Sequence, residues 1–161
     1  METSIGVGLG EIAVSQNRDQ ILVAFGLGSC VGIGAYDPVK GIAGLLHAVL
    51  PEPLNSTDSD STKYVKNGIN KLFEQMIELG AVQERLIIKM AGGANMLTSP
   101  GLSKTFDIGT GNIAVAEKVL QDKKLKIVSQ SVGGNTGRTF RVYVSDGKMT
   151  IRMIGEKETF F

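Results

Sequence analysis

Short apolar runs separated by glycine constrain the fold of this chain more than any other feature of its sequence. The 161 residues include 21 glycines and six phenylalanines but no tryptophan. Glycine permits tight turns and close backbone contacts, and it weakens long regular elements. The pattern therefore favours many short strands over a helical bundle. The continuous apolar run at residues 20–25 predicts a strand that is buried on both faces.

The only cysteine of the chain follows this run directly. Cys30 ends the segment Gly26-Leu27-Gly28-Ser29-Cys30, and the only histidine, His47, lies in a second apolar run. An imidazole that takes the proton of a thiol and later returns it to a leaving group forms a Cys/His nucleophilic pair. The flanking glycines allow a substrate chain to approach the sulfur, and they allow backbone N–H groups to face an oxyanion. The alternative is that both residues only pack, since a free cysteine commonly serves as a small buried hydrophobe.

One hairpin is expected to bring these two side chains together. Residues 31–36 and 41–50 are predicted strands, joined by a turn that starts at Asp37-Pro38. With a turn centred near residue 39, Cys30 lies opposite residue 48, next to His47. A shift of one residue in this register moves every side chain of a strand to the other face of the sheet. The expected proximity therefore depends on the register.

The rest of the chain alternates between strand and helix patterns. Residues 5–14 predict an opening strand broken by bulges, and the polar residues 51–62 predict a surface loop. An apolar stripe predicts an amphipathic helix that Gly80 ends; the stripe consists of Val65, Ile69, Leu72, Met76 and Leu79. Strands are expected at 85–90, 126–131, 139–144 and 149–154, and a second helix at 112–121. This order predicts one α/β or α+β layered domain over residues 1–161.

Composition argues against several functional classes. The formal net charge of +1 gives no pull on nucleic acid, and one cysteine allows neither an internal disulfide nor a multi-cysteine metal site. No apolar stretch reaches the roughly 18 residues of a membrane span, so a cytoplasmic protein without membrane insertion, metal or cofactor is expected. Residues 109–114 match the dinucleotide fingerprint G-x-G-x-x-A, but no buried strand precedes them. Nucleotide binding is therefore a weak alternative.

Five segments taken in order resemble one known family. They are Gly26 to Cys30, His47, Lys63-Tyr64, the run Lys89-Met90-Ala91-Gly92-Gly93-Ala94-Asn95-Met96, and Gly133-Gly134-Asn135-Thr136-Gly137-Arg138. Together they resemble the CheD family of chemoreceptor glutamine deamidases across residues ~5 to ~155. The resemblance implies a layered α/β sandwich with two main helices, similar to the cytotoxic-necrotizing-factor deamidases. It also implies that the substrates are glutamines on the cytoplasmic helices of methyl-accepting chemoreceptors and that the phosphatase CheC is a partner.

The resemblance also implies roles for particular residues. Cys30 matches the family nucleophile and His47 its base, while Gly28, Ser29 and Gly93 are candidates to contact substrate or oxyanion. The family commonly has a threonine six residues before the cysteine, where this chain has Ala24. Something else must then orient the imidazole, and the candidates are a backbone carbonyl or a hydroxyl from Thr57 or Thr62.

Two further expectations follow from the resemblance. A Cys/His pair without the threonine can still deamidate glutamine, and it can also cleave a receptor glutamyl methyl ester. The alternative is that loss of the threonine marks a catalytically weak adaptor that binds CheC or receptor helices. In the final glycine-rich segment, Arg138 is the one side chain able to contact an acidic receptor or partner surface.

Overall fold

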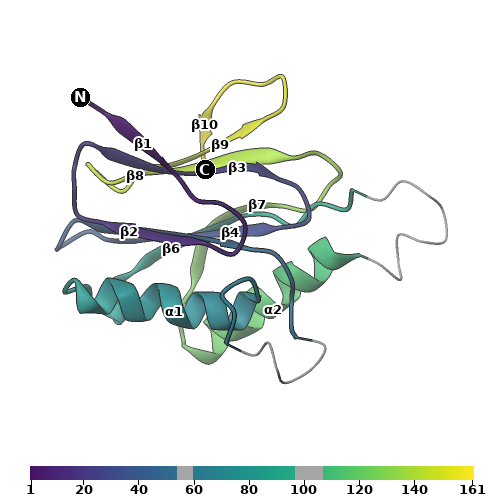
Figure 1. The fold of residues 1–161 in the computed structure, drawn as a ribbon, viewed down its shortest axis with the longest axis horizontal. Coiled ribbons are helices and arrows are strands. Elements are labelled where there is room, and N and C mark those ends of the chain that lie inside the picture. Colours follow the sequence, from purple (N-terminus) through teal and green to yellow (C-terminus); the bar gives the residue numbers. More distant parts are fainter. Residues whose placement is uncertain (54–59, 97–106) are drawn as a thin grey trace.

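A computed structural model describes residues 1–53, 60–96 and 107–161 of the chain. Figure 1 shows three layers, in which one sheet lies above a second and two helices cover the far face of that second sheet. This confirms the predicted α+β layered fold.

The upper sheet, sheet A, has the strand order β1-β3-β8-β9-β10. Its strands are β1 (Thr3–Gly6), β3 (Gln20–Leu27), β8 (Arg138–Tyr143), β9 (Met149–Met153) and β10 (Thr159–Phe160). β1 runs parallel to β3, and the other neighbours are antiparallel. Sheet A thus joins the two ends of the chain.

The lower sheet, sheet B, has the strand order β2-β5-β4-β6-β7. Its strands are β2 (Ile12–Ser15), β5 (Ile42–Ala48), β4 (Val31–Asp37), β6 (Ile87–Gly92) and β7 (Ile127–Val132). The predicted single opening strand at residues 5–14 is wrong, because β1 and β2 belong to different sheets. β4 and β5 pair as the hairpin that the sequence predicted, and β4 is the central strand of sheet B.

Two helices cover the outer face of sheet B: α1 (Val65–Glu78) and α2 (Ile108–Asp122). The predicted stripe of α1 is buried from Val65 to Met76, whereas Leu79 is exposed and Gly80 follows with a φ of 112°. A short 3-10 helix, η2 (Gln83–Arg85), leads into β6. Within the described ranges, no helix is long and apolar enough to cross a membrane.

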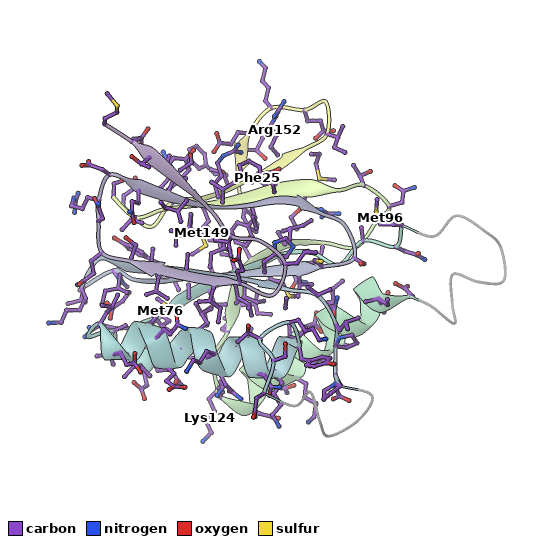
Figure 2. All side chains as sticks on the ribbon, viewed as in Figure 1. Phe25, Met76, Met96, Lys124, Met149 and Arg152 are labelled. Atoms are coloured by element: carbon purple, nitrogen blue, oxygen red, sulfur yellow. The ribbon has the colours of Figure 1, made fainter. Side chains whose placement is uncertain are left out.

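Apolar side chains form two separate cores. The helix-side core lies between sheet B and the helices, and the inter-sheet core lies between the two sheets. Figure 2 shows Met76 at the inner side of α1 and Met149 between the sheets, one in each core. Side chains of β4 and β5 alternate between these cores, because successive residues of a strand point to opposite faces. Each position in this hairpin is therefore assigned to one core by its register.

An ion pair between the buried Asp37 and the partly exposed Arg85 fixes the turn of the hairpin. The Asp37 carboxylate accepts hydrogen bonds from the N–H groups of Val39 and Lys40 and two from the Arg85 guanidinium, at 2.8–3.1 Å. The Val82 N–H donates a further bond at 2.9 Å. Burial alone raises the pKa of Asp37, but these donors outweigh it and hold the pKa well below its usual range.

Candidate active site

The cysteine lies in a turn that connects the two sheets. Residues 28–30 link β3 of sheet A to β4 of sheet B. The ladder between β3 and β8 is irregular between Ala24 and Leu27, whose side chains both lie in the inter-sheet core, whereas Phe25 in this β-bulge is exposed. Bulges re-aim a strand and are common beside active sites. Cys30 itself is half-buried and packs against the inter-sheet core.

The register of the hairpin places Cys30 and His47 on the same face of sheet B. Val31 pairs with Ala48, and Gly32 pairs with His47. The expected pairing of Cys30 with residue 48 is therefore wrong by one residue, because the same register continued beyond Val31 sets Cys30 opposite residue 49. With the observed register the two side chains lie on one face of the sheet, because residues 47 and 49 share a face whereas residues 47 and 48 do not. Cys30 and His47 become diagonal neighbours, a relation that in antiparallel ladders spans about 7–8 Å between Cα atoms.

A backbone carbonyl orients the imidazole of His47. His47 is 4% exposed, and its Nδ1 lies 2.9 Å from the carbonyl oxygen of Val7. A carbonyl can only accept a hydrogen bond, so Nδ1 is the donor and carries a proton. Of the candidates from the sequence, the backbone carbonyl is therefore correct. Thr62 donates instead to the Gly10 carbonyl, and Thr57 lies outside the described residues.

Ala24 occupies an apolar environment. It is fully buried in the inter-sheet core, to which Cys30 and Val7 also belong. No hydroxyl at position 24 is needed to satisfy Nδ1, because that atom already has its acceptor in Val7.

Burial keeps the thiol of Cys30 protonated at neutral pH. It raises the pKa of the thiol above the ordinary value, and the backbone N–H of Cys30 offsets only part of the rise. Only the thiolate is strongly nucleophilic, so a thiol in this environment needs a base at the moment of attack. The imidazole of His47 lies on the same face of sheet B.

Three hydrogen bonds fix the backbone of the turn. The carbonyls of Gly28, Ser29 and Cys30 each accept one bond of 2.8 Å, from the Ala94 N–H, the Asn112 side-chain amide and the Gly93 N–H respectively. The Gly93 N–H, expected at the oxyanion, thus holds the Cys30 carbonyl. In the part of the chain that the structure describes, the N–H groups of residues 28–30 have no acceptor apart from the contact between the Cys30 N–H and its own sulfur. They remain the candidate oxyanion donors.

The final glycine-rich segment is hydrogen-bonded to the end of β6 and to Asn95 beyond it. Gly133 donates to the Gly92 carbonyl, and Asn95 donates to the Gly134 carbonyl. Arg138 is only 4% exposed, and its guanidinium donates to the Ser131 carbonyl and hydroxyl and to the carbonyls of residues 133 and 136. The expectation that Arg138 contacts an acidic partner surface is therefore wrong.

Sequence reasoning missed Asn112 because it misplaced the start of α2. The helix begins at Ile108, four residues before the predicted start, and Asp107 caps it by accepting from the N–H and hydroxyl of Thr110. The G-x-G-x-x-A match at 109–114 thus lies within a helix and forms no phosphate-binding loop. A polar Asn112 on the same stripe as buried Ala116, Val119 and Leu120 was the available signal.

A pocket of about 190 Å³ opens beside the turn. Its walls come from Ser29, the end of β6 and the start of α2, namely Ala94, Asn95, Met96, Asp107, Ile108 and Gly109. Met96 and Ile108 are exposed there, and Figure 2 shows Met96 at this end of the sandwich. Within the described ranges, no three His, Cys, Asp or Glu residues are grouped to bind a metal. The site therefore combines a thiol, an oriented imidazole and backbone N–H groups beside a partly apolar pocket.

Comparison with known proteins gives consistent matches. A family model described as CheD chemotactic sensory transduction matches residues 49–153, a segment that begins after His47. A probable chemoreceptor glutamine deamidase CheD of Caldanaerobacter subterraneus is 41% identical over 96% of this chain and 96% of its own. One from Symbiobacterium thermophilum is 36% identical over 94% and 93%, as is the chemoreceptor glutamine deamidase CheD of Thermotoga maritima. These relatives cover the part of the chain that carries Cys30 and His47.

Proposed function

The chain belongs to the CheD family, and from that premise we propose that it deamidates glutamine side chains of chemoreceptors, with Cys30 as nucleophile and His47 as base. One observation carries the assignment of the pair. The Val7 carbonyl fixes the proton of His47 on Nδ1, which leaves Nε2 as the base on the face that Cys30 shares. Both residues occur once in the chain, so within it no other thiol or imidazole competes for these roles.

The first half of the reaction forms a thioester. The Cys30 sulfur attacks the carboxamide carbon of the glutamine while His47 Nε2 takes the thiol proton. The carbonyl oxygen becomes an oxyanion, which the N–H groups of the turn at residues 28–30 stabilise. The C–N bond then breaks, and His47 gives its proton to the departing ammonia. The enzyme is left as a glutamyl thioester with a neutral imidazole.

The second half hydrolyses the thioester. His47 Nε2 takes a proton from water, and the resulting hydroxide attacks the thioester carbon. The S–C bond breaks, the proton returns to the sulfur, and a glutamate side chain is released. The sum is glutamine plus water giving glutamate plus ammonia. A glutamyl methyl ester enters the same thioester with methanol as leaving group, so a methylesterase side activity belongs to the proposal.

The absence of the family threonine does not argue against turnover. An orienting group holds the tautomer and direction of the imidazole, and the Val7 carbonyl supplies both here. The adaptor alternative rests on Ala24 alone. Binding of CheC, receptor helices as partners and a cytoplasmic location are part of the same proposal through family membership.

Mass spectrometry of a receptor cytoplasmic fragment tests the proposal. Incubation with the protein should add about 1 Da at defined glutamines, because an amide becomes an acid. Cys30→Ala should abolish the gain, whereas Ser29→Ala, which removes the neighbouring hydroxyl, should retain it. Wild-type rates with Cys30→Ala would refute the nucleophile. Binding to the fragment or to CheC without any mass gain would support the adaptor instead.

A further inference from the structure

We propose that Asn112 is a positioning residue that clamps together the two strands carrying Cys30 and His47. Its side-chain Nδ2 donates to the Ser29 carbonyl at 2.8 Å and to the Val49 carbonyl at 3.0 Å. Ser29 directly precedes the cysteine, and Val49 is two residues beyond the histidine. The inference rests on the proposed function, because it assigns a purpose to this clamp within the same reaction.

The clamp lies where the β4–β5 ladder stops. The last pair at this end is Val31 with Ala48; beyond it, one chain forms the turn at residues 28–30 and the other leads towards α1. Ser29 and Val49 lie beyond this pair, so no ladder hydrogen bond holds their carbonyls together. One amide group of α2 joins them instead. Asn112 thus restrains the separation of the two strands at the end where their reacting side chains lie.

The direction of the amide is fixed by its partners. Both partners are carbonyl oxygens, which only accept, so the NH₂ group must face them. The amide oxygen is then left in the interior, where Oδ1 has no hydrogen-bond partner among the described residues. Asn112 is fully buried. Buried polar atoms without partners are rare in native proteins, so each one calls for an explanation.

The start of α2 is seated so that the amide reaches both carbonyls. A Cβ at Gly109 would lie 2.4 Å from the Ala94 carbonyl oxygen, so only glycine allows the helix to approach the end of β6 this closely. Ala94 in turn donates to the Gly28 carbonyl. The helix, the end of β6 and the cysteine turn therefore form one connected support. Asn112 is the only side chain of the described residues that contributes a hydrogen bond to the carbonyls of residues 28–30.

The decisive variant is Asn112→Leu, which keeps a comparable volume and removes both donors. Leu120→Ala is the matched control, because Leu120 is a fully buried residue of the same helix in the helix-side core. The unfolding free energy, the pH dependence of Cys30 alkylation by iodoacetamide, and kcat and KM on a receptor fragment are measured for each. The single cysteine makes the alkylation specific to the site.

We expect Asn112→Leu to lower kcat by about 10- to 100-fold with little change in KM, because the bound substrate meets a displaced sulfur. Its alkylation profile should shift towards that of His47→Ala. Leu120→Ala should lose stability and keep the wild-type kcat and alkylation profile at temperatures where it is folded. If Asn112→Leu does not fold, Asn112→Ser undergoes the same measurements with the same expected direction.

Three outcomes would overturn the inference, and they are distinguishable. If His47→Ala alters the alkylation profile but the folded Asn112 variant matches wild type in profile and kcat, the clamp is refuted and the Cys/His pair stands. If His47→Ala leaves the profile unchanged, the pair and the clamp fall together. A loss of kcat in Leu120→Ala equal to that of Asn112→Leu would also refute positioning, since it would reduce the effect to general destabilisation.

Discussion

Gly92→Ala tests how closely the cysteine turn is held by the end of β6. Gly92 has a φ of 107°, and a Cβ built on it would lie 2.2 Å from the Cys30 carbonyl oxygen. Contacts between a Cβ and another heavy atom essentially never fall below 3.0 Å, so the two backbones must separate by most of an ångström. The atom that must move belongs to the residue with the candidate nucleophile. Substitution here should therefore affect both stability and catalysis.

Two costs add up in this variant. An alanine in a backbone region that favours glycine costs of order 1–3 kcal/mol, and forcing an extra carbon into a closed contact typically costs about 1–3 kcal/mol more. The clash is with backbone, so a change of rotamer cannot relieve it. A displacement of the sulfur on this scale can lower kcat about 100-fold.

Gly80→Ala is the control that carries the backbone cost without the steric cost. Gly80 has a φ of 112°, close to that of Gly92, but a Cβ there has no atom within 4 Å. Urea unfolding should show Gly92→Ala to be about 1–3 kcal/mol less stable than Gly80→Ala. Deamidation of a receptor fragment should be impaired in Gly92→Ala alone. Equal unfolding free energies with unchanged kcat in both variants would show that the turn tolerates the shift, and the reasoning would be refuted.

Ala24→Thr, which restores the family residue, should bring no gain in kcat over wild type, because Nδ1 of His47 already bonds the Val7 carbonyl. It should be about 1–3 kcal/mol less stable than Ala24→Val by urea unfolding, since its hydroxyl enters an apolar core. A kcat of Ala24→Thr above that of both wild type and Ala24→Val would show that the hydroxyl orients the imidazole. Arg85→Met should raise the pH at which acid unfolding begins, measured by circular dichroism. The lowered pKa of Asp37 stabilises the fold above its unfolded-state value of about 3.9, and this contribution is lost as pH falls through the folded-state pKa. Without Arg85 the folded-state pKa rises, so protonation destabilises the protein at a higher pH; an unchanged acid midpoint would contradict the assigned cause.

The hairpin shows what the sequence could predict about the site. Its two strands, its turn at Asp37 and the approximate proximity of Cys30 and His47 follow from local patterns. The register does not, because it depends on a four-residue turn that Asp37 stabilises together with the distant Arg85. A partner so far along the chain leaves no local signal, and the error of one residue was enough to place the two side chains on opposite faces.

The supporting groups were harder to predict, each for its own reason. Val7 acts through its carbonyl, which every residue type has, so its identity carries no signal. Asn112 does leave a signal, a polar residue on an apolar helical stripe. That signal was hidden because the glycines before it favoured a later helix start. Arg138 was expected to contact a partner surface, but its guanidinium instead donates to four backbone and hydroxyl acceptors, and arginine is rarely buried without such partners.

The group that orients His47 is the backbone carbonyl of Val7, so it does not depend on which side chain occupies position 7. Every codon at position 7 still supplies a carbonyl, so alanine scanning or saturation mutagenesis cannot delete the acceptor. Such screens would identify the thiol and the imidazole and would leave their orientation unexplained. Replacing the amide between Val7 and Gly8 by an ester, which weakens the carbonyl as an acceptor, addresses the atom itself. By the same reasoning, a change of side chain at position 24 leaves this acceptor in place.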